Sequence, residues 1–356
     1  MAQKHKVTLK QIAQKVGCSH TAVSVVLGNP NGNSGVGPDL RRRIEAAAKR
    51  MGYETNYHAQ ALRAGKANAL GLMFGAGSRS QLQVGFFSRM IAGLDEFARS
   101  RNHDLVIVGS GPGEGHLNRG VQYINRRRID ALIIPGVMYP EQVLNRDDRP
   151  MPVVAAIPPP GKTFYPAVDL DYGPGLKEAV RLFREKGHRD VLAIHALPDT
   201  HHYTEGRVKD FCRLAREAGM EAEMLCLESS QQGEGGSRLA TIRNFRERFA
   251  LWLEKNECPG AILAHNELNG IGIYQALAAK GLAVPRDVSL IAFDDIWADL
   301  TVPPMTVIST HLDKVGQEAG ALALDILDDS SWVDDPPRRY VSASLVPRES
   351  VGPARG

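Results

Sequence analysis

The sequence predicts a small, wholly helical head followed by an α/β core of two lobes, each a doubly wound parallel sheet. Three observations lead to this prediction. Short helices with clear start and stop signals fill residues 8–52, apolar strands alternate with helical patterns from residue 69 onward, and charge is divided between these parts. Residues 1–66 hold eleven Lys or Arg against three acids, a formal charge of +8, whereas the remaining 290 residues carry −5. A basic segment on a mildly acidic body is typical of a polyanion-binding module joined to a second function.

Composition and length exclude several classes of protein. With 43% hydrophobic and 23% charged residues among 356, the chain is neither disordered nor collagen-like, and it can bury two or three separate cores. No apolar run reaches the ~18 residues that span a bilayer, and the N-terminal residues lack the apolar segment of a secretory signal. The cysteines form no CxxC pair, which disfavours a disulfide framework or a zinc site: Cys18, Cys212, Cys226 and Cys258. We therefore expect a cytoplasmic protein with no membrane span and no cofactor.

The first two predicted helices form a helix-turn-helix. Thr8 and Gln11 have the spacing of a capping box, and Gly17 ends the helix that starts there. Ser19 is a good N-cap for a second helix that runs through Leu27. In this motif the second helix enters the major groove of duplex DNA, although the same motif also occurs as plain helix packing. The charge of +8 favours DNA as the partner.

Two further helices complete the predicted head. The third begins at Pro38, which suits the first helical position, and ends at Gly52. Its apolar stripe leaves Arg41–Arg43 largely outside. Residues 56–65 predict a fourth helix of less than three turns, which is too short to be stable alone in water. The loop Gly28–Gly37 is rich in Gly and Asn, and the sequence leaves its role open.

From residue 69 onward, strand-like and helix-like patterns alternate. The strand-like runs are LGLMF, DLVIVG, ALIIPG and VVAAI, and then VLAI, MLCL, AILA and VSLIAF. The helical patterns lie near residues 84–100, 117–127, 173–186, 204–218, 238–256 and 268–280. Such alternation predicts parallel sheets covered by helices on both faces. Two series of strands predict two lobes with a cleft at the carboxyl ends of the strands.

The sequence contains no GxSxG elbow, Walker loop or HExxH motif. The segment Gly109–Gly113 is rich in glycine but lacks the spacing of a phosphate-binding loop, so we expect a plain loop. His195, His201 and His202 are close in sequence, but adjacent histidines do not easily share one metal ion, and we expect no metal site. The neighbouring carboxylates Asp294-Asp295 diverge at a strand end, which disfavours two-carboxylate catalysis. We therefore expect no catalytic residues and no enzyme activity.

The pattern of the head indicates a family. VTLKQIAQKVGCSHTAVSVVLGN, followed by RRRIEAAAKRMGYETNYHAQALRAGKANALGLMF, resembles the LacI/GalR family of bacterial transcription regulators, and the resemblance covers nearly the whole chain. It implies a helix-turn-helix domain at 1–55, a hinge helix and linker at 56–67, and a two-lobed effector-binding and dimerisation domain at 68–347, related to periplasmic binding proteins. It also implies three crossings between the lobes, the first at Gly187-His188. The implied lobes are about 68–186 with 312–330, and about 187–310 with 334–347.

The same resemblance implies which residues contact DNA. In this family the hinge helix folds on the operator and a leucine enters a minor-groove step; Leu62 matches that leucine, with a core position in the linker as the alternative. Val25 stands where the family often has an arginine, so the usual guanine contact is absent and polar reading falls to His20 and Thr21. The full implied set is Thr8, Ser19, His20, Thr21, Ser24, Val25, Asn56, Ala59, Gln60 and Leu62.

The core also resembles the family's effector-binding domain, through stretches such as GFFSRMIAGLDEFARSRNHDLVIV and AILAHNELNGIGIYQALAAKGLAVPRDVSLIAFDD. The effector positions that this resemblance implies are Phe87, Tyr172, Arg207, Asn266, Asp294 and Trp297. An arginine fork, an amide and a carboxylate suit the hydroxyls of a carbohydrate, and an aromatic ring suits its apolar face. An interlobe salt bridge is the alternative for Arg207 and Asp294, and core packing is the alternative for Phe87. Glu267 and Thr310 depart from the residues common in the family.

Together these features predict a homodimeric regulator that represses at a pseudo-palindromic DNA operator under the control of a small effector. One alternative is a solute-binding protein for transport, which would need a signal peptide and no basic head. Another is a small-molecule hydrolase, which would need a catalytic constellation. No Lys or Arg lies between Gly17 and Leu40, so we expect the basic residues to hold phosphate and the acidic body to make no DNA contact.

Overall fold

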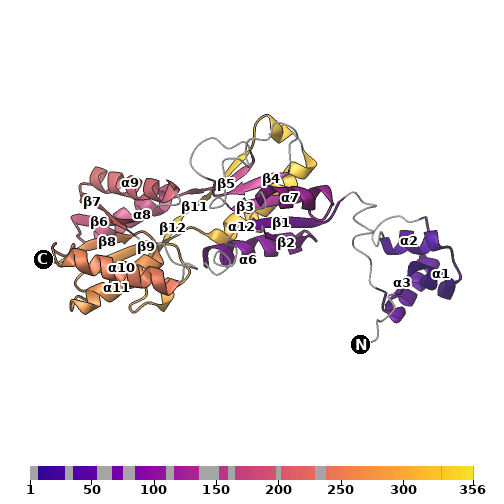
Figure 1. Ribbon diagram of the computed structural model, residues 1–356, viewed down its shortest axis with the longest axis horizontal. Coiled ribbons are helices and arrows are strands. Elements are labelled where there is room, and N and C mark those ends of the chain that lie inside the picture. Colours follow the sequence, from indigo (N-terminus) through magenta and orange to yellow (C-terminus); the bar gives the residue numbers. More distant parts are fainter. Residues whose placement is uncertain are drawn as a thin grey trace. The chain divides into compact units, whose positions relative to one another are not determined.

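The computed structural model describes residues 7–28, 35–53, 66–74, 85–109, 116–135, 152–158, 165–197, 202–228, 238–329 and 331–355. The chain divides into two compact units, Met1–Asn68 with Asn125–Arg128, and the remainder. In Figure 1 the described part of the first unit is helical, and the second unit contains sheets flanked by helices. Among the described residues, no helix is long and apolar enough to cross a membrane.

The head is built from α1 (Leu9–Val16), α2 (His20–Gly28) and α3 (Pro38–Met51). Because apolar residues recur every three or four positions in each helix, the three stripes can meet in a single core. That core consists of Ile12, Ala13, Val16, Val23, Val26, Ile44, Ala47 and Ala48. These positions lie on the stripes predicted from the sequence, so the helical head is confirmed.

Local capping signals set the ends of these helices. The backbone amide of Thr8 donates to Gln11 Oε1 at 2.8 Å and the Gln11 amide donates to Thr8 Oγ1 at 3.4 Å, which completes the predicted capping box. The Ala22 amide donates to Ser19 Oγ at 3.1 Å at the start of α2. Gly17 ends α1 in the left-handed conformation, φ 75°, which glycine adopts without steric penalty.

The first sheet of the core has six strands in the order β11-β5-β4-β3-β1-β2, all parallel to their neighbours. The strands are β1 (Ala69–Phe74), β2 (Asp104–Gly109), β3 (Ala131–Pro135), β4 (Val153–Ala156), β5 (Ala167–Asp171) and β11 (Arg338–Ser342). The helices that flank this sheet are α6 (Gly85–Ser100), α7 (His116–Asn125) and α12 (Leu312–Asp328) (Figure 1). Helices cover the sheet because its central strands are apolar on both faces.

The second sheet repeats this topology in the order β12-β10-β9-β8-β6-β7. Its strands are β6 (Asp190–Leu197), β7 (Glu221–Glu228), β8 (Ala261–Ala264), β9 (Ser289–Phe293), β10 (Thr306–Ser309) and β12 (Ser344–Val346). Its helices are α8 (Gly173–Glu185), α9 (His202–Glu217), α10 (Arg238–Leu253) and α11 (Glu267–Ala279), with the short 3₁₀ turn η3 (Ala298–Leu300). A second 3₁₀ turn, η4 (Ser331–Val333), follows α12. Only the pair β10 and β12 is antiparallel. Two doubly wound, mainly parallel sheets are the predicted fold class, and the structure confirms it.

Three segments connect the lobes: β5 to α8, β10 to α12, and β11 to β12. The segments are bonded to one another, because the Ala343 amide donates to the Asp171 carbonyl at 2.8 Å and His311 Nε2 lies 2.7 Å from Ser344 Oγ. A Cβ at Gly175 would lie 2.7 Å from Ile308 Cγ2, so only glycine lets α8 start this close to the crossing. The three crossings implied by the family resemblance are present.

The expected lobe boundaries need two corrections. Helix α8 packs on the second sheet, where Leu176 and Phe183 share a core with Val191 and Phe211, so the first crossing lies between β5 and α8 and not at Gly187-His188. Strand β11 belongs to the first sheet, although its residues were expected in the second lobe. The alternation of strands and helices predicts each element but does not determine which sheet an element covers, because a short connection can pass to either lobe.

Candidate functional site

The exposed face of α2 carries three of the expected base-reading residues. His20, Thr21 and Val25 are all exposed, Val25 to 38% of its surface. Ser24 was expected on the same face but is buried, because positions 23, 24 and 26 of α2 turn toward the other two helices. The surface of α2 that DNA could reach is therefore formed by His20, Thr21 and Val25.

Thr8 and Ser19 stand at the starts of α1 and α2. Their side chains are exposed, and each takes part in the N-terminal cap of its helix. The free backbone amides and the positive end of the helix dipole at such positions suit a phosphate oxygen. The remaining expected DNA contacts, together with the predicted hinge helix, lie outside the described residues: Asn56, Ala59, Gln60 and Leu62.

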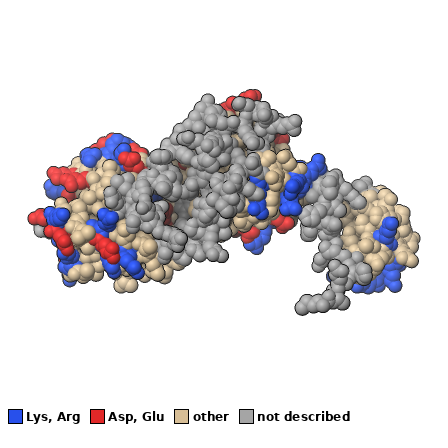
Figure 2. Space-filling view, viewed as in Figure 1, with Lys and Arg blue, Asp and Glu red and all other residues tan. Residues whose placement is uncertain are grey.

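Apart from Lys66, which precedes β1, the basic residues of the described head lie on α1 and α3 and not on α2. They are Lys10, Lys15, Arg41, Arg42, Arg43, Lys49 and Arg50. Two of them form exposed pairs within α3, Arg41 with Glu45 and Arg42 with Asp39, both at 3.6 Å. Arg43 instead donates to the Val16 carbonyl at 2.8 Å and so ties α3 to α1. Figure 2 shows positive charge spread over the surface of the head.

A second candidate site lies at the carboxyl ends of the strands of the second sheet. Arg207, on α9, is its central residue and is buried, with 6% exposure. Its guanidinium donates to the His265 carbonyl at 2.7 Å and lies 3.5 Å from the hydroxyl of Tyr172. The guanidinium also stacks 4.0 Å above the ring of Phe293, the last residue of β9. This contact fixes the orientation of the guanidinium plane, so that its N–H groups can point at two neighbouring hydroxyls.

Asp294 lies beside this arginine and follows β9 directly. Burial raises the pKa of its carboxyl, while the charge of Arg207 and a 3.3 Å hydrogen bond from Thr310 Oγ1 lower it. Its backbone is left-handed, φ 72°, a conformation that an aspartate adopts at some energetic cost. Arg207 and Asp294 both belong to the second lobe and no ion pair of the described residues joins them, so the alternative of an interlobe salt bridge is wrong.

Asn266 and Glu267 follow β8 at the start of α11. Asn266 caps the helix, because its Oδ1 accepts the Asn269 amide at 2.9 Å. The carboxylate of Glu267 accepts the amides of Ile296 and Trp297 at 2.7 and 2.6 Å. Burial raises the pKa of Glu267 to about 7 despite these two bonds, which lower it. Glu267 therefore fixes the segment that carries Trp297, a half-buried residue.

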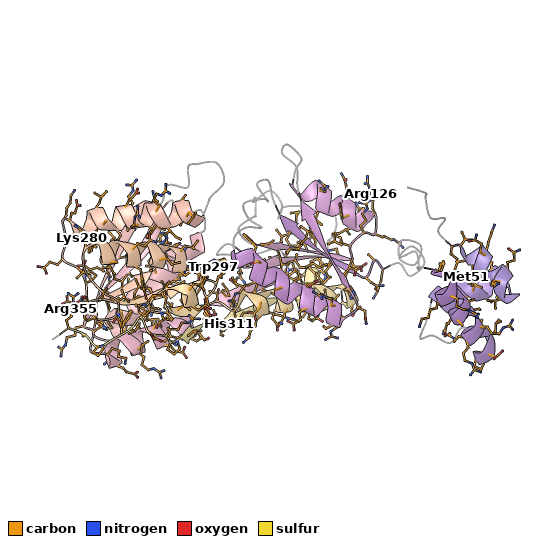
Figure 3. The ribbon with its side chains drawn as sticks, turned by 90° about the horizontal axis from the view of Figure 1, so that it is seen from below. Met51, Arg126, Lys280, Trp297, His311 and Arg355 are labelled. Atoms are coloured by element: carbon orange, nitrogen blue, oxygen red, sulfur yellow. The ribbon has the colours of Figure 1, made fainter. Side chains whose placement is uncertain are left out.

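Phe87 is the one expected effector residue on the first lobe. It lies in the first turn of α6 and is 4% exposed, so it takes part in the core of that lobe. The start of α6 meets the second lobe, because a Cβ at Gly85 would lie 2.4 Å from Ile296 Cγ2. Figure 3 shows Trp297 and His311 in this same region, where the lobes adjoin. The first turn of α6 therefore faces the segment that Glu267 holds.

Comparison with known proteins identifies the family. Residues 8–56 match the model described as bacterial regulatory proteins, lacI family, and residues 180–351 match the periplasmic binding protein-like domain. The HTH-type transcriptional regulator AglR of Rhizobium meliloti (strain 1021) is 30% identical over 367 residues, which cover 98% of this chain and 95% of the relative. The chain belongs to the LacI family of bacterial regulatory proteins. It is a DNA-binding transcription regulator and not an enzyme.

Other similar proteins agree with this assignment. The repressor PurR of Pectobacterium carotovorum subsp. carotovorum (strain PC1) is 24% identical, covering 97% of this chain and 96% of the relative. Among solved structures, the lac repressor dimer bound to operator and the anti-inducer ONPF has a TM-score of 0.78 at 19% identity, covering 98% of this chain and 99% of that one. The regulator CelR in complex with cellobiose has a TM-score of 0.60 at 22% identity, covering 97% and 100%. At these identities the structures show a shared fold.

The candidate site around Arg207 includes residues that the sequence did not indicate. Phe293 supports the guanidinium of Arg207, and the carbonyl of His265 accepts its hydrogen bond. The ring of His265 contacts His195 edge-on, with centroids 5.2 Å apart. His265 and Phe293 stand at the ends of β8 and β9, where parallel strands place ligand-facing residues. Examination of each strand's last residues would have found both, but the contact with Arg207 depends on the fold.

Proposed function

We propose that this LacI-family regulator is a cytoplasmic, homodimeric repressor of a pseudo-palindromic operator, controlled by a carbohydrate that binds between its lobes. One observation carries the proposal for the ligand. Arg207 Nε is buried without a hydrogen-bond partner, while the other two nitrogens of the guanidinium bind the protein. A buried donor without an acceptor is destabilising, and a ligand hydroxyl would supply the acceptor.

The neighbouring groups favour a polyhydroxylated ligand. The Asp294 carboxylate would accept from one hydroxyl while Arg207 donates to another, and Trp297 and Tyr172 offer apolar ring faces. The cellobiose complex of CelR and the ribose-bound regulator from Enterococcus faecalis V583 support a sugar as the ligand. The polar groups belong to the second lobe and Phe87 to the first, so a ligand that contacts both would favour one relative position of the lobes.

Control of DNA binding follows from thermodynamic linkage. If the ligand and the operator prefer different lobe arrangements, each changes the affinity of the other by the same factor. A two-fold dimer presents two copies of the α2 surface, which suits a site with two related half-sites. The base readers His20, Thr21 and Val25 would contact the major groove, and Leu62 would enter the minor groove at the centre.

The test combines a ligand screen with operator binding. The full-length protein is heated with monosaccharides, disaccharides, sugar acids and nucleobases, and a ligand of the native state raises the melting temperature. We expect a sugar or sugar derivative to do so and to change affinity for duplexes that the protein selects from a random library. A nucleobase as the sole ligand would refute the carbohydrate proposal.

Removal of residues 1–66 should abolish DNA binding and keep the thermal shift; full regulatory activity of the shortened protein would refute the repressor proposal.

A further inference from the structure

The connection from α7 to β3 carries three consecutive arginines. Arg126, Arg127 and Arg128 are all exposed, and no carboxylate of the described residues forms an ion pair with Arg126 or Arg127. Figure 3 labels Arg126 just beyond the end of α7, and Figure 2 shows positive charge gathered at this end of the lobe. Residues 67–356 as a whole carry a net negative charge, so this run is a local reversal of charge within them.

The strand register places these arginines at one edge of the first sheet. Strands β1, β2 and β3 are parallel, with Ala69 opposite Asp104, and the Asp130 amide donates to the Ala69 carbonyl at 2.7 Å. The connections that precede β1, β2 and β3 therefore lie at the same edge. Arg101 precedes β2 there, with its guanidinium 5.6 Å from the Phe97 ring centroid. The chain from the DNA-binding head enters β1 at this edge as well.

The backbone of Arg127 shows that its side chain has a role. In the described part of each connection, one residue lies in the left-handed region: Asn68 before β1 (φ 51°), Asn102 before β2 (φ 55°) and Arg127 before β3 (φ 51°). Asparagine and glycine adopt this conformation easily, whereas a long side chain does so at an energetic cost. Two connections have the favoured asparagine and the third has arginine. A charged side chain kept at a position that disfavours it indicates a function beyond the turn.

We propose that Arg126, Arg127 and Arg128, with Arg101 beside them, form a second phosphate-binding surface that contacts the backbone of the DNA held by the head. This inference rests on the DNA-binding function of the head. The segment from Gly52 to Ala69 spans 17 residues, whose fully extended length is at most about 60 Å. Tethering raises the local concentration of phosphate there, so that weak contacts become effective. This proposal differs from the expectation, drawn from charge alone, that the acidic body makes no DNA contact.

The experiment measures how operator affinity depends on salt. The full-length variant R126Q/R127Q/R128Q is compared with wild type on a duplex that the wild type selects from a random library. Each phosphate contact contributes about 0.9 to the slope of log K against log salt, so a loss of two or three contacts in each subunit of the dimer should make the slope shallower by about 4 to 5. The matched control is K177Q/R181Q/R184Q, which removes the same charge from an exposed face of α8 and should leave the slope unchanged. Equal slopes for the two variants would overturn the proposal, as expected if the run binds a protein partner instead.

A single substitution separates DNA contact from a structural role. Arg127→Gly removes the charge and also relieves the left-handed strain, so the melting temperature should stay equal or rise, while the loss of one contact in each subunit makes the salt slope shallower by about 2. A lower melting temperature with an unchanged slope would show that Arg127 stabilises the fold only. If the wild type selects no duplex at all, the DNA-binding function fails and this inference fails with it. If the wild type binds normally and the arginine variants match it, only this inference fails.

Discussion

The carboxylate of Glu267, at the start of α11, accepts the backbone amide of Trp297 at 2.6 Å across 30 residues of sequence. The same oxygen accepts the Ile296 amide at 2.7 Å, so one buried side chain fixes the whole turn that follows Asp294. The family commonly has a shorter aspartate at this position, which lacks one methylene of reach. The departure noted from the sequence thus has a structural meaning: Glu267 sets the position of the segment that carries Trp297.

Stability should depend on pH through Glu267. Burial raises its pKa from 4.5 to about 7, so the folded protein retains a proton in this window that the unfolded chain has released. The free energy of unfolding therefore falls as pH rises from about 4.5 to about 7. Glu267→Gln cannot titrate and keeps an acceptor for both amides. Between pH 4.5 and pH 7 the free energy of unfolding of wild type should fall by about 3 kcal/mol relative to that of this variant, as measured by denaturant unfolding. If the free energy of unfolding depends on pH in the same way in both proteins, Glu267 is not the group that titrates in this range.

Asp294→Asn should separate ligand binding from stability. Asparagine keeps the acceptor for Thr310 and adopts a φ of 72° more easily, and it removes a carboxylate whose pKa burial raises. The melting temperature should rise, while affinity for the sugar found in the screen falls about tenfold or more. The matched control is Asp295→Asn, which breaks the 2.6 Å pair with Arg348. That control should lower the melting temperature and keep ligand affinity; the same pattern in both variants would argue against a binding role for Asp294.

Arg207→Lys should weaken ligand binding although the charge is kept. An ammonium group cannot stack flat on Phe293 and also bond the His265 carbonyl in the same plane. We expect a loss of about 1.5–3 kcal/mol in ligand affinity, the range for hydrogen bonds to charged groups, measured by calorimetry. Operator affinity without ligand should stay near that of wild type. Wild-type ligand affinity in the lysine variant would rule out recognition by the planar fork.

Val25→Arg should change the operator preference. Val25 is exposed on α2, so the substitution should change the free energy of unfolding by no more than about 0.5 kcal/mol. An arginine there can bind guanine with two hydrogen bonds, which discriminates by about 1–3 kcal/mol. Selection from a random library should show a new guanine in each half-site. Val25→Ala serves as the control, because it removes methyl contacts and adds no donor. An identical selected site for wild type and Val25→Arg would place Val25 away from the bases.

Leu62→Ala tests the minor-groove wedge expected from the family resemblance. Loss of the wedge should lower operator affinity, because less contact then repays the unstacking of a base step. The thermal shift caused by the ligand should be unchanged, since the effector residues lie in the core. Leu300→Ala is a matched control, an equal truncation at a leucine that is 71% exposed on the second lobe. Wild-type operator affinity in Leu62→Ala would favour a core position in the linker.

Much of the fold was predictable because its signals are local. The Thr8–Gln11 capping box, the glycine that ends α1 and the apolar stripe of each head helix act over three or four residues, and the structure contains them all. The alternation of apolar strands with helices likewise predicted two doubly wound sheets. Local signals did not determine to which lobe an element belongs. Helix α8 follows the first crossing and β11 precedes the third, and each joins the sheet on which its apolar side chains pack.

The sequence by itself determined which elements form, where the head helices begin and end, and which part of the chain carries positive charge. Tertiary structure alone decided that Arg207 gives its hydrogen bond to a carbonyl 58 residues away and lies flat on Phe293. It also decided that Ser24 faces inward and that Arg127, in the connection before β3, has a left-handed backbone. The physical reason is the distance along the chain over which each interaction acts. Capping and periodicity act within one turn of helix, whereas a buried guanidinium finds its partners only after distant strand ends are brought together.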